Sequence, residues 1–257
     1  MTPKQSPCSH GDLLTRIRQT QIAWLTSALL TFSTVPVWAG DKASDEETFR
    51  HATAVLGAMV DSNAVSADVL AKADCVVVLP SVKKFAVGFG GSGGRGPMIC
   101  RGGKNFGGRW SAPAMFTIGG ASAGFQLGGS STDFILVIMS AAAVHKVLSG
   151  KTKVGRDMTA AAGPSGATSV GSVGGADILT YGRAKGLFAG MSLGGASLEP
   201  DNDANKRLYG KSASASDIVV ANEVRVTPGG ESLITLLNSK VARRRLTSGS
   251  SASYKTR

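Results

Sequence analysis

The spacing of apolar residues changes near residue 73, and it divides the chain into a helical segment and a largely β segment. Across residues 41–72 apolar side chains recur at helical intervals, at Phe49, Ala52, Leu56, Met59 and Val60. This periodicity predicts one helix whose apolar face packs on the rest of the domain. Ser44, with Glu47 three residues later, is the predicted N-cap of that helix.

Beyond residue 73 short β-branched runs alternate with stretches rich in glycine and serine, a pattern typical of strands joined by turns. The predicted strands cover residues 74–80, 84–89, 97–101, 114–128, 134–139, 176–181 and 186–193. The predicted turns are at 90–96 and 130–133. The predicted short helices are at 141–148, 201–209 and 232–241. We therefore expect an α+β fold, in which helices pack on an antiparallel, strongly curved sheet or barrel-like β core.

The N-terminus predicts an export signal that precedes this fold. Arg16 and Arg18 come before an apolar run, and small residues stand three positions and one position before a predicted cleavage site after Ala39. Pro36 interrupts the run, which is shorter than the ~20 apolar residues that a membrane-spanning helix needs. A signal peptide at residues 1–39 is thus expected to send the protein to a periplasmic, envelope-associated or secreted location.

A single domain is predicted at residues 40–242, because no linker divides the chain after the signal. Residues 243–257 are basic and rich in serine, so we expect a disordered tail there. Cys75 and Cys100 are the two cysteines of the part expected to be exported. Export permits a disulfide between them, but two buried thiols fit the sequence equally well.

Composition adds a formal charge of +11 and 34 glycines to this picture. Eight cations in predicted loops, turns and helix ends are candidate ligands for lipid headgroups: Lys83, Lys84, Lys151, Lys153, Arg183, Lys185, Lys206 and Arg207. If they converge, they form a patch that attracts anionic headgroups or nucleic acid; otherwise they are solvated loop charges. Nucleic acid is not an expected partner, because aromatic residues for base stacking are few and export separates the protein from it.

Three motifs are candidates for chemistry, and the residues around each favour a structural role. Ser122 lies in a G-x-S-x-G pattern, which in a serine hydrolase joins a strand to a helix. Asp133 and His145 would have to complete the triad, but the residues after Ser122 favour a strand. The glycine pattern at 88–93 lacks the helix that a dinucleotide site requires. Asp201 or Asp203 is a predicted helix N-cap rather than a calcium ligand. We predict no catalytic, cofactor or metal site.

An ordered series of short motifs runs along most of the chain. The motifs are Trp110-Ser-Ala-Pro113-Ala-Met-Phe116, Gly120-Ala-Ser-Ala-Gly-Phe-Gln-Leu-Gly128, Asp133, Gly163-Pro, Tyr181-Gly-Arg-Ala-Lys-Gly-Leu-Phe-Ala-Gly190 and Tyr209-Gly210. This series resembles the SYLF domain, also called the Ysc-type actin-binding domain, over most of the part after the signal. The resemblance implies a lipid-binding domain. Eukaryotic members bind phosphoinositides and some bundle actin, whereas bacterial members are typically exported.

The first predicted helix departs from the family pattern. Eukaryotic members use a basic amphipathic helix at this position for membrane binding, but the segment here begins Asp45-Glu46-Glu47 and carries only Arg50 and Lys72 as cations. Phosphoinositide binding by this helix is therefore not expected, nor is actin a suitable partner for an exported protein. The sequence favours an exported protein that binds phospholipid or a membrane surface without catalysis. The alternatives are a structural envelope protein with a protein partner, and a serine hydrolase using Ser122.

Overall fold

The structure is a computed structural model of the whole chain. It describes residues 41–241, apart from residues 88, 104, 124–127, 164–174, 185–186, 190–194 and 211–212. The described helices are α2 (Lys42–Asp61), α3 (Ala67–Lys72), α4 (Ala141–Leu148), α5 (Asn202–Tyr209), the π-helical turn η2 (Asp217–Ala221) and α6 (Pro228–Lys240). The described strands are β1 (Cys75–Val87), β2 (Phe89–Cys100), β3 (Ala114–Ala123), β4 (Gly128–Ile138), β5 (Thr152–Lys153), β6 (Ala160–Ala162), β7 (Ile178–Ala184), β8 (Leu187–Ala189) and β9 (Ser197–Pro200).

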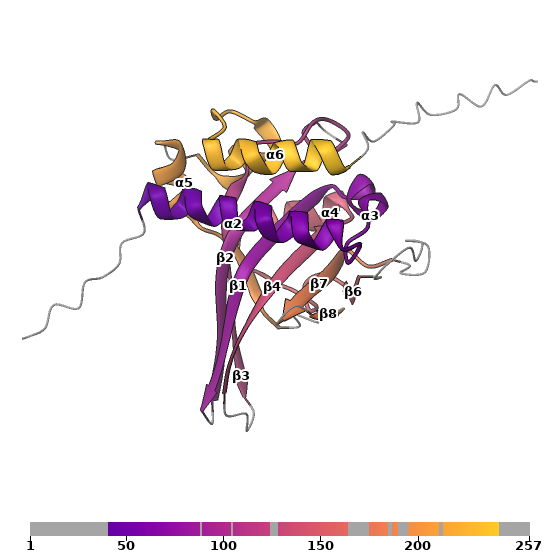
Figure 1. Cartoon of the computed structure of the whole chain (residues 1–257). Coiled ribbons are helices and arrows are strands. Elements are labelled where there is room, and N and C mark those ends of the chain that lie inside the picture. Colours follow the sequence, from indigo (N-terminus) through magenta and orange to yellow (C-terminus); the bar gives the residue numbers. More distant parts are fainter. Residues whose placement is uncertain are drawn as a thin grey trace, which may run out of the picture. The chain divides into compact units, whose positions relative to one another are not determined.

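The strands form one curled sheet in the order β5-β9-β3-β2-β1-β4-β7-β6, with β8 paired to β7. Neighbouring strands are antiparallel except for β6 and β7, which run parallel. Helices α2 and α6 lie side by side over one end of the sheet, and the long strands β1 to β4 extend well beyond them (Figure 1). The predicted α+β fold with a curved sheet and packed helices is confirmed, and the parallel pair makes the sheet mixed rather than purely antiparallel.

The sheet buries side chains on both of its faces. Val76 and Val78 of β1 pack in one apolar cluster with α2, α3 and α6. Their neighbours Cys75 and Val77 pack in a second cluster with α4 and η2. Because successive side chains of a strand point to opposite faces, two covered faces require a continuous apolar run, which explains why the start of β1 is so uniformly hydrophobic.

A bulge in β1 corrects several predicted element boundaries. The pairing register shifts between Val77 and Lys83, and Ser81 adopts a positive φ of 54°, so the strand continues past Pro80 instead of ending there. A Cβ at Gly96 would lie 1.9 Å from the Val78 carbonyl oxygen. The glycine-rich residues 90–96, predicted as a turn, therefore belong to β2, where they leave room for the bulged backbone.

Residues 130–133, also predicted as a turn, lie within β4. They pair with the part of β1 that follows the bulge, with Ser131 opposite Lys83 and Thr132 opposite Val82. Serine and aspartate are typical turn residues, and aspartate is depleted in strands, but the ladder to β1 supplies the backbone hydrogen bonds of this segment. The sheet context therefore overrides the local signal.

The predicted helix at 41–72 is two helices. Ser62 ends α2, Asn63 has a positive φ of 57°, and Ser66 caps α3 by accepting the Val69 N–H. The N-cap of α2 is Asp41 rather than Ser44, since the Asp41 carboxylate accepts the Ser44 N–H at 2.7 Å.

The later helices follow the sequence more closely. Residues 141–148 form α4 as predicted, and Asp201 caps α5 by accepting the Ala204 N–H at 3.0 Å. Helix α6 begins at Pro228, four residues before its predicted start, because Thr227 is its N-cap and proline suits the first helical position.

Three residues singled out in the sequence have clear structural roles: Cys75, Cys100 and Gly163. Cys75 and Cys100 are directly paired on β1 and β2 and form a disulfide, which decides between the two alternatives left open by the sequence. A Cβ at Gly163 would lie 2.0 Å from the Tyr181 ring. That tight contact explains the glycine of the Gly163-Pro motif, and burial raises the pKa of Tyr181 to about 12.

The predicted signal peptide at 1–39 and the predicted tail at 243–257 lie outside the described residues. Within the described part of the chain, no helix combines the length and the hydropathy needed to cross a bilayer.

Candidate functional site

The eight predicted headgroup ligands do not form a single patch. Lys83 and Lys84 are consecutive residues of β1, so their side chains point to opposite faces of the sheet. Lys83 is exposed, whereas the Lys84 ammonium lies 5.7 Å from the centre of the Phe134 ring. Lys185 is outside the described residues.

Arg183 is bound within the fold. It lies opposite Asp133 in the β7–β4 pair, and its Nε and Nη2 atoms donate to the Asp133 carboxylate at 3.0 and 2.6 Å. The other Asp133 oxygen accepts the Ser81 N–H at the bulge of β1. Arg183 therefore ties three neighbouring strands together, and its charge is already compensated.

Lys151 and Lys153 belong to a basic turn beside the end of α4. Lys146 reaches the same turn and donates through Nζ to the Asp157 carbonyl oxygen at 2.8 Å. The Asp157 carboxylate accepts the Lys153 N–H at 2.7 Å. Arg156 is the fourth exposed cation of this turn. All four cations of this turn are exposed to solvent.

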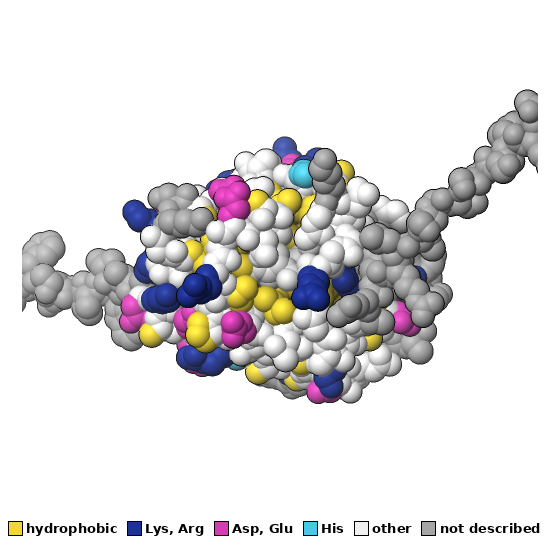
Figure 2. Space-filling model, turned by 90° about the horizontal axis from the view of Figure 1, so that it is seen from above, with side chains coloured by type: hydrophobic (Ala, Val, Ile, Leu, Met, Phe, Trp, Pro, Cys, Tyr) yellow, Lys and Arg dark blue, Asp and Glu magenta, His cyan; other side chains and the backbone are white. Residues whose placement is uncertain are grey.

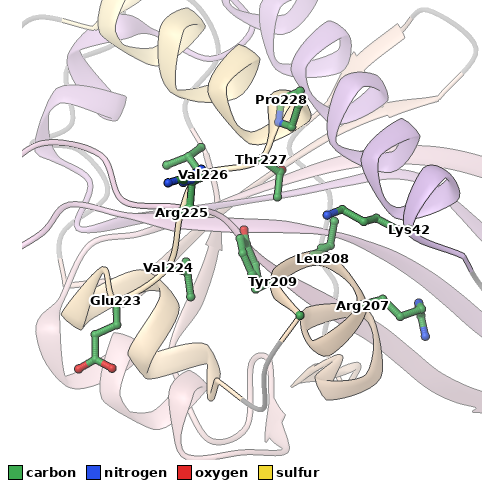
Figure 3. A pocket seen from close by; sticks show the side chains of 11 residues that line it. Lys42, Arg207, Leu208, Tyr209, Glu223, Val224, Arg225, Val226, Thr227 and Pro228 are labelled. Carbon is green, nitrogen blue, oxygen red and sulfur yellow. The ribbon is translucent and has the colours of Figure 1, made fainter.

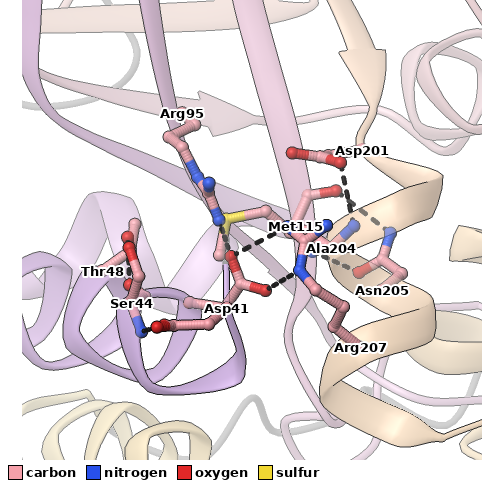
Figure 4. A network of polar contacts seen from close by, with 10 residues as sticks. Asp41, Ser44, Thr48, Arg95, Met115, Asp201, Ala204, Asn205 and Arg207 are labelled. Atoms are coloured by element: carbon pink, nitrogen blue, oxygen red, sulfur yellow. Dashed lines mark hydrogen bonds and ion pairs between the residues drawn. The ribbon is translucent and has the colours of Figure 1, made fainter. Parts of the chain in front are cut away.

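Arg207 takes part in a buried ion cluster that joins α2, β2 and α5 (Figure 4). The fully buried Asp45 carboxylate accepts from Arg207 Nε at 2.9 Å and from Arg95 Nη2. Burial lowers the pKa of Arg95, and the charge of nearby Asp201 opposes that effect. Both guanidinium groups are about one-third exposed. Arg95 nevertheless remains charged, because the ordinary pKa of a guanidinium group lies far above neutrality.

Asn205 fixes α5 beside the same cluster. Its side-chain oxygen accepts the Met115 N–H at 2.6 Å, and its amide nitrogen donates to the Met115 carbonyl at 3.1 Å. Asn205 is fully buried. Its side chain pairs the Met115 N–H and adds a second donor to the Met115 carbonyl, which also accepts the Asp201 N–H at 2.9 Å. The result is a rigid position for the last turn of α5.

The last turn of α5 forms one wall of a cleft of about 410 Å³, which we call the α5 cleft (Figure 3). Its lining residues are Lys42, Arg207, Leu208, Tyr209, Gly210, Glu223, Val224, Arg225, Val226, Thr227 and Pro228. They come from the start of α2, the end of α5, the segment before α6 and the first turn of α6. A volume of this size lies in the range of small-ligand pockets.

The walls of the α5 cleft are mainly apolar, and cations stand at its rim. The Lys42 side chain extends from α2 toward Tyr209, while the head groups of Arg207 and Glu223 point away from the cleft (Figure 3). The Tyr209 hydroxyl donates to the Pro113 carbonyl oxygen. Burial, followed by the charge of Glu46, raises the Tyr209 pKa. Tyr209 thus presents its ring to the cleft as a neutral group.

Lys42 and Arg225 are the rim cations that sequence reasoning missed. Both are exposed, and within the described residues neither has a salt-bridge partner. Of the eight predicted ligands, Arg207 alone lines the cleft among those described, and the exposed Lys206 precedes it in α5. No local signal could have found the other two, because the fold brings together three segments that are distant in sequence.

Figure 2 shows the same end of the molecule from above. Several Lys and Arg side chains gather at the end where Figure 1 places α5, next to exposed apolar side chains and with some acidic residues between them. Cations therefore do concentrate near the α5 cleft, and this set shares Arg207 and Lys206 with the predicted one.

The serine-hydrolase geometry is not formed around Ser122. Ser122 lies within β3 and pairs with Gly90 of β2, whereas a nucleophile elbow needs a sharp turn into a helix. Both oxygens of Asp133 are engaged, by Arg183 and by the Ser81 N–H. His145 lies on α4, where its ring meets the Phe106 ring edge-on with centroids 6.2 Å apart.

Comparisons with known proteins agree with the motif series. Residues 119–240 match the Ysc84 family model, described as Las17-binding protein actin regulator. The match includes α5 and the segment before α6, and therefore Arg207 and Arg225 of the α5 cleft, but it begins after Lys42.

Curated relatives are found in fungi and animals. Protein YSC84 of Saccharomyces cerevisiae is 32% identical over 166 residues, which cover 62% of this chain and 35% of the relative. LAS seventeen-binding protein 3 of the same species is 30% identical over 193 residues, covering 73% and 41%. SH3 domain-containing YSC84-like protein 1 of Rattus norvegicus is 33% identical over 179 residues, covering 68% and 51%.

The chain thus spans about a third to a half of the length of these relatives. The family model covers the chain from Gly119 in β3 to Lys240 at the end of α6. The folded domain of this chain therefore belongs to the Ysc84 (SYLF) family.

Proposed function

We propose that the domain binds membrane surfaces rich in anionic phospholipid and carries out no catalytic step. The observation that carries the proposal is the α5 cleft, where apolar walls stand beside two exposed cations that have no salt-bridge partner among the described residues. This combination suits a ligand with an anionic head and an apolar body. A basic residue near an anionic membrane contributes ~1 kcal/mol of binding free energy.

The disulfide supports the exported location that we propose for this binding. Cys75 and Cys100 are both fully buried and bonded to each other. Disulfides persist in oxidising compartments and are rare where thiols are kept reduced. Together with the predicted signal peptide, this favours the lipids of a cell envelope as the target.

Vesicle flotation tests the proposal directly. The protein without residues 1–39 would be mixed with vesicles of phosphatidylcholine alone or with 30% phosphatidylglycerol. We expect flotation with the anionic vesicles, little with the neutral ones, and release in 1 M salt, where the screening length falls to about 3 Å. Equal flotation with both vesicles, unaffected by salt, would reject the role of the cations.

A protein partner is the second candidate function, and the names of the relatives favour it. The family description refers to a Las17-binding actin regulator, and one relative is named LAS seventeen-binding protein 3. Co-sedimentation of the same protein with actin filaments tests one such partner. Pelleting with filaments in physiological salt, without flotation on anionic vesicles, would replace the lipid proposal with a protein-binding one.

A further inference from the structure

We propose that the α5 cleft holds one acyl chain of a single anionic phospholipid, while Lys42 and Arg225 bind its phosphate at the rim. This inference rests on the proposed lipid-binding function and makes it more specific. Surface attraction alone would hold the domain against many headgroups at once. A chain in the cleft would instead give a complex with one lipid per domain.

The walls of the cleft carry the first part of the argument. Leu208 and Tyr209 form one side, and Val224, Val226 and Pro228 form the other. The polar end of Tyr209 is turned to the Pro113 carbonyl, so the aromatic ring faces the space. An apolar wall of this kind gives no hydrogen bonds to a free phosphate or a sugar, but it gains free energy by removing methylene groups from water.

The side-chain charges at the rim of the α5 cleft provide the second part of the argument. The nearby guanidinium of Arg207 is committed to Asp45, whereas Lys42 and Arg225 have no salt-bridge partner within the described residues. Glu223 is the carboxylate in the lining, and its head group points away from the cleft (Figure 3). The ligand that matches this rim is an anion attached to an apolar chain, rather than a neutral lipid.

The position of the rim cations relative to the walls sets the expected binding mode. Lys42 begins α2, and Pro228 begins α6, so the positive ends of two helix dipoles meet here, while α5 ends here with its negative end. These dipoles partly cancel. The two side-chain charges therefore decide the preference for an anionic headgroup.

Isothermal titration with short-chain lipids below their micelle concentrations separates chain binding from headgroup binding. The probes are glycerophosphoglycerol, dibutanoyl and dihexanoyl phosphatidylglycerol, dihexanoyl phosphatidylcholine and inorganic phosphate. Each buried methylene tightens binding about four-fold, so one inserted chain predicts about a 16-fold tighter Kd for dihexanoyl than for dibutanoyl phosphatidylglycerol, at one lipid per domain. Phosphate and glycerophosphoglycerol should bind far more weakly, and the phosphatidylcholine several-fold more weakly.

A variant of the wall provides an independent check. Val224→Thr keeps the shape of the side chain but places a hydroxyl in the apolar wall, and it should weaken dihexanoyl phosphatidylglycerol binding about five-fold. Val60→Thr is the matched control, because Val60 is also partly buried but lies on α2 outside the cleft lining. Far-UV circular dichroism establishes that both variants are folded.

Several results would overturn the inference. A Kd that does not change with chain length, binding of inorganic phosphate as tight as that of the lipid, or equal weakening by the two valine variants would each show that no chain enters the α5 cleft. If anionic vesicles still float the protein in that case, the proposed function stands without this site. If they do not, the proposed function fails as well.

Discussion

The cations near α5 fall into two groups that differ in what surrounds them. Arg95 and Arg207 meet a fully buried carboxylate, Asp45. A short distance away Lys42 and Arg225 stand at the rim of the α5 cleft with no salt-bridge partner among the described residues. The number of positive charges therefore does not locate a binding surface. The first two guanidinium groups are already paired with Asp45, whereas Lys42 and Arg225 are available to a ligand.

Arg207 shows how one residue can serve both regions. Its guanidinium is held by Asp45, while the residue also lines the α5 cleft. Long cationic side chains often cover apolar surface with their stems and keep the charged group elsewhere. The ion cluster thus positions the last turn of α5, and the last turn of α5 shapes the cleft.

The difference between paired and unpaired cations is tested first by Asp45→Asn, which should cause the largest loss of stability. Removing one partner of a buried ion cluster leaves the remaining charges poorly compensated, and both arginines reach solvent in part, so we expect a loss of about 3 kcal/mol in the free energy of unfolding. Urea unfolding followed by circular dichroism measures it. Binding to anionic vesicles should stay within two-fold of the wild type at temperatures where the variant is folded; a large loss of binding in a folded sample would place Asp45 in the binding site.

Arg183→Gln tests another cation that is already paired with a carboxylate of the fold. The sequence suggests Arg183 as a headgroup ligand. The variant removes a charged pair of hydrogen bonds to Asp133, which is mostly buried, and should cost about 2 kcal/mol of stability. Vesicle binding is expected not to change. Weaker binding with unchanged stability would move Arg183 into the class of available cations.

The Asp177 carboxylate accepts hydrogen bonds mainly from neutral groups. Hydrogen bonds from the Ser140 and Thr159 hydroxyls lower the Asp177 pKa below its ordinary value of 3.8. The stability that this group contributes is therefore complete above that value and is lost as the pH falls through the lower, folded-state pKa. Asp177→Asn should flatten the decline of unfolding free energy between pH 5 and pH 2, as measured by urea unfolding at each pH; an unchanged slope would contradict the assignment.

Asp61→Asn should have the smallest effect. The Asp61–Lys240 pair joins α2 to α6, but both side chains are largely exposed, at 61% and 41%. Such pairs contribute less than about 1 kcal/mol, because water and salt screen them. A thermal melt should shift by at most a degree or two. A shift as large as that of Asp45→Asn would show that burial is not what separates the two kinds of ion pair.

Some helices and helix caps were predictable, because the residues that determine them are close together in the sequence. Residues 141–148 form α4, and Asp201 caps α5, because each depends on residues within one or two helical turns. The glycine-rich strand β2 was not predictable in this way. Its glycines suggest a turn on propensity, but Gly96 is needed because the bulged backbone at Val78 approaches it. That contact involves another strand and leaves no trace in the local pattern.

The candidate site was predictable only in part. Charge and family resemblance pointed to cations that meet lipid, and Arg207 does line the α5 cleft. Lys42 and Arg225 were missed because the cleft assembles the start of α2, the end of α5 and the segment before α6. Conversely, Arg183 lies beside a glycine-rich turn in the sequence, but the pairing of β7 with β4 places it opposite Asp133.

The most direct measurement of the central claim compares two matched double variants on vesicles with 30% phosphatidylglycerol. Lys42→Gln with Arg225→Gln removes the two rim charges, and Lys72→Gln with Arg109→Gln removes two other exposed cations; Lys72 ends α3, at the opposite end of α2 from α5 (Figure 1). At ~1 kcal/mol per charge, the first variant should bind about 30-fold more weakly at unchanged stability, and the second should bind nearly as well as the wild type. Equal losses in the two variants would contradict the account, because binding would then follow the total charge of the protein and not the α5 cleft.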